Sequence, residues 1–144
     1  MNKRFGGLYA PDEATRFETA RDLPAKDPEV AKALLALIDR ERSTQVISAA
    51  LNNLAFHEVA EVVPVARRLL AHKDFGVRMS ATTLLGALED AESLEALRGL
   101  SVGDPHEDVR REAANAVKVI DGTWAEGLSA NDIEIMLEGI VEEN

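Results

Sequence analysis

The stretch Gly76-Val77-Arg78-Met79-Ser80-Ala81-Thr82-Thr83-Leu84-Leu85-Gly86 carries a pattern that recurs along this chain. It consists of a β-branched residue, an arginine, an alanine three positions after the arginine and a leucine seven positions after it. With Arg78 as position zero, the equivalent residues are Arg16, Ile47 and Arg110, so the copies start 31, 31 and 32 residues apart. A near-constant period of this size indicates stacked structural repeats, because each unit buries its apolar face against its neighbours.

Three positions of the pattern are small or apolar in nearly every copy. They are Thr15, Val46, Val77 and Val109 at position −1, Thr19, Ala50, Ala81 and Ala113 at position +3, and Leu23, Leu54, Leu85 and Val117 at position +7. At 100° per residue these positions share one face of a helix. They predict the buried stripe of the second helix in each repeat.

Each of these helices is preceded by a second helical pattern. Asp27-Pro28 is typical of a helix start, with Asp27 as N-cap. Asp104-Pro105 is expected to open the last repeat helix, and Pro11 is expected in the first turn of the first helix. Pro64 falls inside its helical pattern and predicts either a late helix start or a kink. Gly99 and Gly103 are expected to flank a short connection.

The whole chain, residues 1–144, is therefore predicted to be one all-α domain. The expected architecture is an α-solenoid of antiparallel helix pairs, a HEAT-like or ARM-like superhelix of about eight helices, with the repeats in residues 11–120. Residues 1–10 form an N-terminal arm, and we expect its apolar side chains, Phe5, Leu8 and Tyr9, to cover the first helix. Residues 121–144 are predicted to be a linker and a C-terminal capping helix, with Trp124 joining that helix to the last repeat.

The charge balance restricts the possible partners. With 26 acidic and 16 basic side chains, the chain has a formal net charge of −10. This argues against nucleic acid and anionic membranes, because both repel an acidic surface, and it suits a basic protein partner. No apolar run approaches the roughly 18 residues of a membrane span. Residues 1–10 also lack the apolar segment of a secretory signal, so a cytoplasmic location is expected.

The residues from Asp104 to Ala114, DPHEDVRREAA, resemble the second-helix signature of HEAT repeats, and residues 72–86 are a looser copy. The short period resembles the bacterial HEAT-like type also found in phycobilin lyases. The resemblance covers residues 11–120, although the copy at Ile47 lacks the arginine and the copy at Arg16 has threonine at positions −1 and +3. It implies an α-solenoid and a protein-binding scaffold. Because the motif is a packing motif, it transfers no active site.

Positions +1, +5 and +8 lie opposite the buried stripe, and in HEAT-like pairs the second helices usually line the concave face. No carboxylate occupies these positions, and Gly86 is among them. They predict a groove for an extended or helical polypeptide, with amides for backbone contacts and apolar anchors. The alternative is that Phe17 and Met79 are tucked under neighbouring repeats and the rest is ordinary surface. The candidate partner-binding residues are Phe17, Arg21, Ser48, Asn52, Met79, Thr83, Arg111, Asn115 and Lys118.

The recurring arginines allow two interpretations. Arg16, Arg78 and Arg110 could form a phosphate-binding ladder, or each could pair with an acid near a helix start. We expect the second, with an acid of the same or the adjacent helix such as Asp74, Asp104 or Asp108, because the guanidinium fork suits carboxylates and helix ends.

Nothing in the sequence predicts catalysis, a cofactor or a metal site. The chain has no cysteine, which excludes thiol chemistry. The three histidines, His57, His72 and His106, lack the spacing of metal motifs, and no nucleophile elbow or phosphate-binding glycine loop is present.

A non-catalytic module that binds another protein on its concave face is therefore the favoured function. One alternative is an immunity or inhibitor protein that masks a basic toxin or enzyme. Another is a bilin-lyase-like chaperone or enzyme subunit, which the short repeat type suggests. Nucleic-acid binding through the arginines is opposed by the net charge.

Overall fold

A computed structural model describes residues 3–123, together with Asn131 and Ile135. The helices are η1 Lys3–Tyr9, α1 Glu13–Asp22, α2 Pro28–Arg40, α3 Thr44–Leu54, α4 Val62–Leu69, α5 Phe75–Ala87, η2 Ala91–Ser93, α6 Leu94–Gly103 and α7 Glu107–Asp121. Here η1 and η2 are 3-10 helices, and this part of the chain contains no strand. The all-α fold class is confirmed. The predicted capping helix and Trp124 lie outside the described residues.

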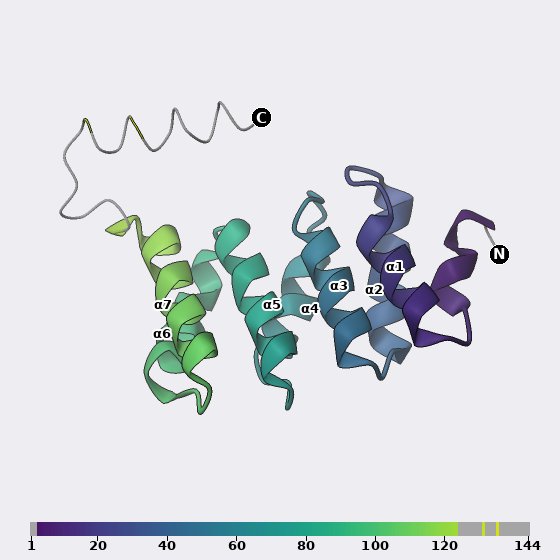
Figure 1. The fold of residues 1–144 in the computed structure, drawn as a ribbon. Helices are drawn as coiled ribbons and strands as arrows, with labels where there is room; N and C mark the ends of the chain where they lie inside the picture. Colours follow the sequence, from purple (N-terminus) through teal and green to yellow (C-terminus); the bar gives the residue numbers. More distant parts are fainter. Residues whose placement is uncertain (1–2, 124–130, 132–134, 136–144) are drawn as a thin grey trace.

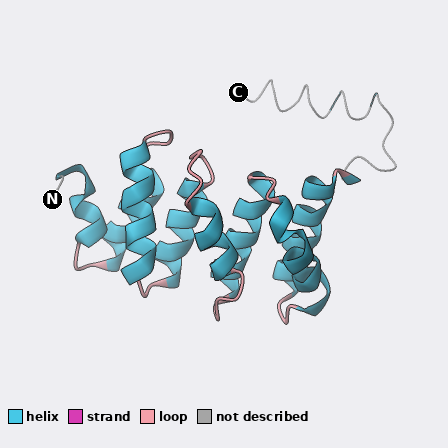
Figure 2. Ribbon diagram, turned by 180° about the vertical axis from the view of Figure 1, so that it is seen from behind, coloured by secondary structure: helices cyan, strands magenta, loops and turns pink. Residues whose placement is uncertain are grey.

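The helices form two layers of a short solenoid. Figure 1 shows α1, α3, α5 and α7 side by side in the nearer layer, and each packs on the next. The helices α2, α4 and α6 lie behind them and face the viewer in Figure 2. Each pairs with the helix that follows it, as α2–α3, α4–α5 and α6–α7. The front layer therefore consists of the second helices of the predicted repeats.

The predicted apolar stripe of each second helix is buried in this layer. At position −1, Val46, Val77 and Val109 are fully buried, and so are the alanines at position +3. Leu54 and Leu85 at position +7 have no exposed surface either. Thr15 and Thr19 are only half-buried, in agreement with their polar side chains on the outermost helix of the layer.

Two of the four helix starts predicted from prolines are confirmed. Asp27 caps α2, and Pro64 is the third residue of α4, so the late helix start is the correct alternative. Other expectations were wrong in detail. Pro11 precedes the N-cap Asp12, and α7 is capped by His106 while Asp104 ends α6. The two glycines Gly99 and Gly103 lie within α6, because exposed helix positions tolerate glycine at a modest cost.

The N-terminal arm covers α1, where a preceding helix would pack in a full repeat. η1 packs against α1 and α2, and Phe5 and Leu8 are buried there, as predicted. The prediction was wrong for Tyr9, which is 50% exposed. Its ring lies under the guanidinium of Arg40, 3.9 Å from the ring centroid, and Arg40 also donates to the Leu8 carbonyl. Its phenol is polar and needs no burial, so the ring packs at the edge of the core.

Two of the recurring arginines tie successive repeats together. Arg78 donates through Nε and Nη2 to the Asp104 carboxylate, at 2.8 and 3.1 Å. Its Nη1 donates to the carbonyls of His72 and Lys73, at 2.9 and 3.0 Å. One guanidinium thus joins the loop before its own helix to the loop before the next second helix. Arg16 does the same with Glu41 and with the carbonyls of residues 10 and 11. The prediction of an acid partner near a helix start is confirmed for Arg78, and Arg16 also has an acid partner, Glu41.

The junction between α3 and α5 has a different composition. Ile47 replaces the arginine there and is buried. The loop position that is Glu41 or Asp104 elsewhere is His72, whose Nδ1 accepts a hydrogen bond from the Asp74 N–H at 3.0 Å. The arginine and its acid are therefore both replaced at the same junction, which has no such ion pair among the described residues. For Arg110 the prediction of an acid partner was wrong: it donates to the Asp104 carbonyl at 2.7 Å and makes no ion pair with a described acid.

Leu85→Ala should lower the free energy of unfolding by about 2–4 kcal/mol, because Leu85 is fully buried and its truncation leaves a cavity. Urea unfolding measures the change. The control is Val102→Ala, at a side chain 83% exposed on α6, which should change stability by less than about 0.5 kcal/mol. Equal stability of the two variants would contradict the burial of the apolar stripe.

Arg78→Met should destabilise by about 3–5 kcal/mol, because it leaves Asp104 buried without its cation. The side chains of Arg78 and Asp104 are 12% and 2% exposed. Arg68→Met is the control, since its pair with Asp39 is 60% and 68% exposed and should contribute at most about 1 kcal/mol.

Acid unfolding provides a second measurement on Arg78→Met. Burial raises the pKa of Asp104, but hydrogen bonds from Arg78 and the His106 N–H outweigh it, so the pKa lies below 3.8. A lowered pKa stabilises the fold above pH 3.8, and this contribution is lost as the pH falls below that value. Without Arg78 the pKa of Asp104 should rise, and acid unfolding should begin at a higher pH. An unchanged acid midpoint would contradict the role of Arg78.

Candidate functional site

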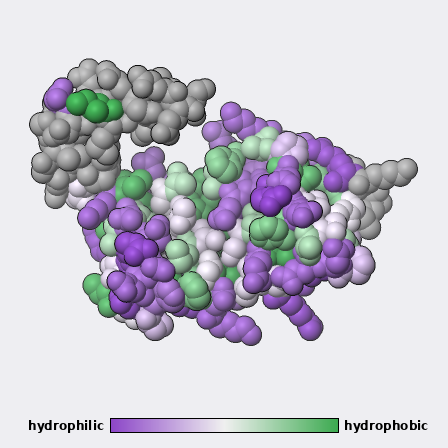
Figure 3. Space-filling view, in the orientation of Figure 1, coloured by the Kyte–Doolittle hydropathy of each residue, from purple (hydrophilic) through white to green (hydrophobic). Residues whose placement is uncertain are grey.

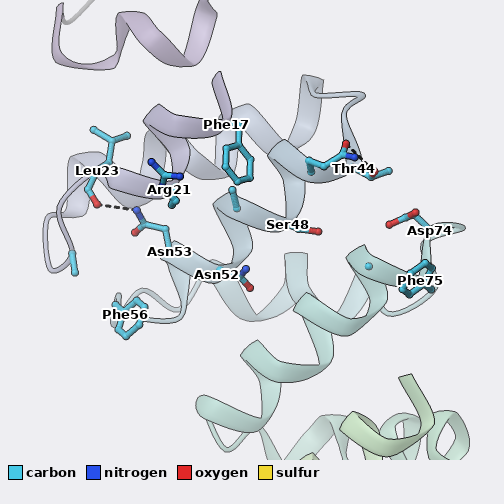
Figure 4. A pocket seen from close by; sticks show the side chains of 14 residues that line it. Phe17, Arg21, Leu23, Thr44, Ser48, Asn52, Asn53, Phe56, Asp74 and Phe75 are labelled. Carbon is cyan, nitrogen blue, oxygen red and sulfur yellow. Dashed lines mark hydrogen bonds between the residues drawn. The ribbon is translucent and has the colours of Figure 1, made fainter. Parts of the chain in front are cut away.

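A groove of about 630 Å³ runs along α3, between the C-terminal half of α1 and the start of α5. Its lining combines apolar side chains with short polar ones. Figure 4 shows Ser48 and Asn52 along α3, with Phe56 on one side of them and Phe75 on the other. The lining residues are Phe17, Arg21, Leu23, Ala25, Thr44, Gln45, Ser48, Ala49, Asn52, Asn53, Phe56, Asp74, Phe75 and Gly76.

Three of the four phenylalanines of the chain line this groove. Phe56 is 69% exposed and Phe75 is 44% exposed, whereas Phe17 is half-buried. Phe75 is held in place by His106, whose ring stacks on it with centroids 3.9 Å apart and planes 6° apart. The guanidinium of Arg21 lies over Phe17, 5.5 Å from the ring centroid. The groove therefore has aromatic walls, two of which are supported by a neighbouring side chain.

The polar side chains in the groove come from the exposed face of α3. Gln45, Ser48 and Asn52 are spaced i, i+3 and i+7, so they follow one another along the helix axis. Ala49 and Gly76 are small and leave room beside them. Figure 3 shows pale and green residues between purple ones on this layer of helices, which agrees with an apolar groove with a polar rim.

A buried polar network holds the wall of the groove. Asn53 Nδ2 donates to the carbonyls of Ala20 and Leu23 at the C-terminal end of α1, at 3.0 and 2.8 Å. Its Oδ1 lies 2.8 Å from Nε2 of the buried His57. Because the Asn53 amide nitrogen is the donor to both carbonyls, Oδ1 is the acceptor and His57 Nε2 carries the proton. Asn53 thus joins α3 to the end of α1.

Four of the nine predicted partner-binding residues meet in this groove: Phe17, Arg21, Ser48 and Asn52. The other five come from α5 and α7 and do not line it. Thr83, Arg111, Asn115 and Lys118 are exposed, and Met79 is half-buried. Positions +1, +5 and +8, which were expected to be exposed, form the predicted strip. Gly86, which belongs to this strip, is buried, and a Cβ built there would lie 3.1 Å from the Ala116 Cβ. Position +8 of α5 therefore belongs to the contact between α5 and α7, so its assignment to the surface was wrong.

Two of the predicted cations already have carboxylate partners. Arg21 donates to both oxygens of Asp22 at 2.8 and 2.9 Å, and Arg111 pairs with Asp108 at 2.8 Å. The opposite charges largely cancel at both places. In the groove, Arg21 and Asp74 are the only ionisable side chains in the lining, and the Asp74 carboxylate caps α5 by accepting from the Val77 N–H.

Sequence periodicity did not identify Phe56, Phe75 or Asn53 as parts of the site. Phe56 follows the C-cap of α3 and Phe75 is the first residue of α5. Both lie at helix ends, where the 100° rule no longer gives the direction of a side chain. The useful signal would have been composition, because phenylalanines at the two ends of neighbouring second helices are unusual in an otherwise aromatic-poor chain.

The histidines take part in the local fold. His72 and His106 each accept a backbone N–H through Nδ1, from Asp74 at 3.0 Å and from Asp108 at 3.1 Å. Within the described ranges, no three histidine, aspartate or glutamate side chains are placed to hold a metal ion.

Comparison with known protein families gives a direct match. The family model of HEAT repeats matches residues 31–118, from α2 through most of α7. This chain belongs to the HEAT-repeat family. HEAT repeats generally mediate protein–protein interactions. No curated protein matches the chain. Among the described helices of this HEAT-repeat protein, none has the length and apolar character needed to cross a membrane.

The buried His57 predicts a pH dependence of stability. Burial lowers the pKa of His57 below 6.5, and the negative charge of Asp27 opposes this only in part. Its Nδ1 is buried and makes no hydrogen bond to the described residues, so a second proton there has no acceptor. The unfolded chain takes up this proton near pH 6.5, so the stabilisation is complete above 6.5 and is lost as the pH falls through the lowered pKa.

His57→Gln keeps a donor for Asn53 but does not titrate. Urea unfolding of both proteins between neutral pH and about pH 5 should show the wild type losing stability faster than the variant as the pH falls. Parallel curves over this range would contradict a depressed His57 pKa.

Proposed function

We propose that this HEAT-repeat protein is a non-catalytic interaction module that holds a segment of another protein in the groove along α3. The exposed aromatic walls support this proposal most directly. Exposed apolar side chains gathered in a concave site are typical of binding surfaces, and aromatic residues contribute strongly to interface energy. Phe56, at 69% exposure, has no role in the core that would account for its position.

The size of the groove suits a short polypeptide segment. The helix α3 has 11 residues and is about 16 Å long at 1.5 Å per residue. An extended segment of about five residues spans the same length. The amides of Gln45 and Asn52 can each donate and accept hydrogen bonds, as a peptide backbone requires. Ser48 lies between them and adds a hydroxyl.

The groove offers little for catalysis. Arg21 and Asp74, the two ionisable residues in its lining, are engaged with Asp22 and with the N-terminus of α5. A nucleophile with an adjacent general base is the usual minimum for covalent catalysis, and the lining residues supply no such pair. This supports a binding role rather than an enzymatic one.

The test compares the same substitution at equivalent positions of two repeats. Asn52 and Asn115 both occupy position +5, but only Asn52 lines the groove. Asn52→Tyr should fill the groove and weaken the complex at least about ten-fold, whereas Asn115→Tyr should leave the affinity unchanged. Capture from a lysate of the native organism supplies the partner, and calorimetry with the purified partner gives the affinities.

Phe56→Ala provides a second variant that removes a groove wall without adding bulk. It should also weaken the complex about ten-fold or more, with thermal unfolding close to wild type because Phe56 is exposed. Loss of binding in Asn115→Tyr together with normal binding in Asn52→Tyr would move the site to the α5–α7 part of the predicted strip and overturn this proposal.

A further inference from the structure

We infer that the groove selects a polypeptide segment in which a large apolar side chain is followed or preceded by basic residues, with the basic end towards the N-termini of α1, α3 and α5. This inference rests on the proposed function, because it specifies the ligand of the same groove. It is argued from the different chemistry of the middle of the groove and of its two ends.

Much of the groove lining is apolar. Phe17, Phe56 and Phe75 face a space bordered by the small residues Ala49 and Gly76. The one cation of the lining, Arg21, is bound through two nitrogens to Asp22 and lies over the Phe17 ring. This region therefore favours a large uncharged side chain, since a charged group would lose its hydration without gaining a partner.

One end of the groove is acidic. A second hollow of about 530 Å³ shares Phe17 and Gln45 with the groove and is otherwise lined by Glu13, Ala14 and Glu18. No lysine or arginine is part of its lining. Glu18 is exposed and Glu13 accepts the Ser43 hydroxyl at 2.6 Å, and neither makes an ion pair with the described residues. Arg21 and Arg16 are bound to Asp22 and Glu41, whose hydrogen bonds raise the pKa of these arginines, and the charges of Glu18 and Glu13 add to that shift. Two carboxylates at this end are therefore available to a cation of the ligand.

The groove itself adds a third carboxylate on the same side. Asp74 is the N-cap of α5, and Glu13 is the first residue of α1. Thr44, the first residue of α3, also lines the groove, so the starts of α3 and α5 border the groove and the start of α1 borders the adjoining hollow. The negative charge of Asp74 is partly offset by the N–H groups that it caps, which leaves Glu13 and Glu18 as the main source of selectivity.

The other end of the groove is close to neutral. A third hollow, of about 320 Å³, shares Phe56 with the groove and is lined by Lys26, Asp27, Pro28, His57, Glu58 and Val59. Asp27 pairs with Arg4 at 2.7 Å, and the charges of Lys26 and Glu58 oppose each other. The asymmetry between the two ends gives the bound segment a direction.

Three labelled synthetic peptides test the inference by fluorescence anisotropy. The first has a central leucine with lysines on one side, the second has glutamates in place of the lysines, and the third has serine in place of the leucine. At low salt the first should bind about ten-fold tighter than the second, and the difference should shrink at high salt. The third should bind more weakly than the first, because it lacks the anchor.

The matched protein variants change charge by the same amount at different places. Glu13→Gln/Glu18→Gln should reduce the affinity for the lysine peptide about three- to ten-fold. The control is Glu29→Gln/Glu95→Gln, two exposed acids in first turns of α2 and α6 in the other layer, and it should leave this affinity unchanged. Thermal unfolding confirms that both double variants are folded.

The outcomes separate this inference from the proposed function. If the lysine and glutamate peptides bind equally and Asn52→Tyr abolishes both, the charge selectivity is wrong and the groove remains the binding site. If the lysine peptide binds equally to wild type, to Asn52→Tyr and to both glutamine pairs, it binds elsewhere, and the inference is overturned. Absence of binding by the lysine peptide also overturns it, while partner capture with the Asn52 and Asn115 variants still tests the groove.

Discussion

The structure depends on one packing constraint: no helix of the front layer can bury its apolar stripe alone. The alanines at position +3 have no exposed surface, and each helix of the layer packs on the next. The helices α5 and α7 also approach each other closely, because a Cβ built on Gly86 would lie 3.1 Å from the Ala116 Cβ. Each repeat is therefore stable only against its neighbours, as expected for a solenoid. The same constraint fixes which faces remain free for a partner.

The ion pairs of the recurring arginines add to this packing. They are present at some junctions between repeats and absent at another. Arg16 and Arg78 join the loops of successive repeats through Glu41 and Asp104. Between them, Ile47 and His72 occupy the positions of the arginine and of its acid. The groove extends across this junction, from α1 over α3 to the start of α5. The exposed side chains of Phe56 and Phe75 thus lie at the α3–α5 junction. Among the described junctions of the front layer, this is the one at which the arginine and its acid are both replaced.

The fold was predictable because the apolar positions that produce it recur at a regular spacing. A spacing of 31 or 32 residues and a stripe at −1, +3 and +7 determine which side chains meet, and only packed helices satisfy both. The candidate site was predictable in part, since Phe17, Ser48 and Asn52 lie on the exposed face of regular helices. Phe56 and Phe75 were not, because they lie where the helices end and the direction of a side chain depends on cap geometry. Asn53 is buried for a reason that appears only in three dimensions, namely the unpaired carbonyls at the end of α1.

The local charges show why the net charge of the whole chain is a weak guide to a binding site. The net charge of −10 suits a basic partner, and the absence of carboxylates on the predicted strip points to a local exception. In the structure the strip cations Arg21 and Arg111 have their own acids, so the strip adds little positive field. Carboxylates without such partners, at Glu13 and Glu18, lie just outside the strip and face the hollow that continues the groove. Residues beside the predicted face, rather than on it, therefore determine the sign of the charge that a bound segment meets.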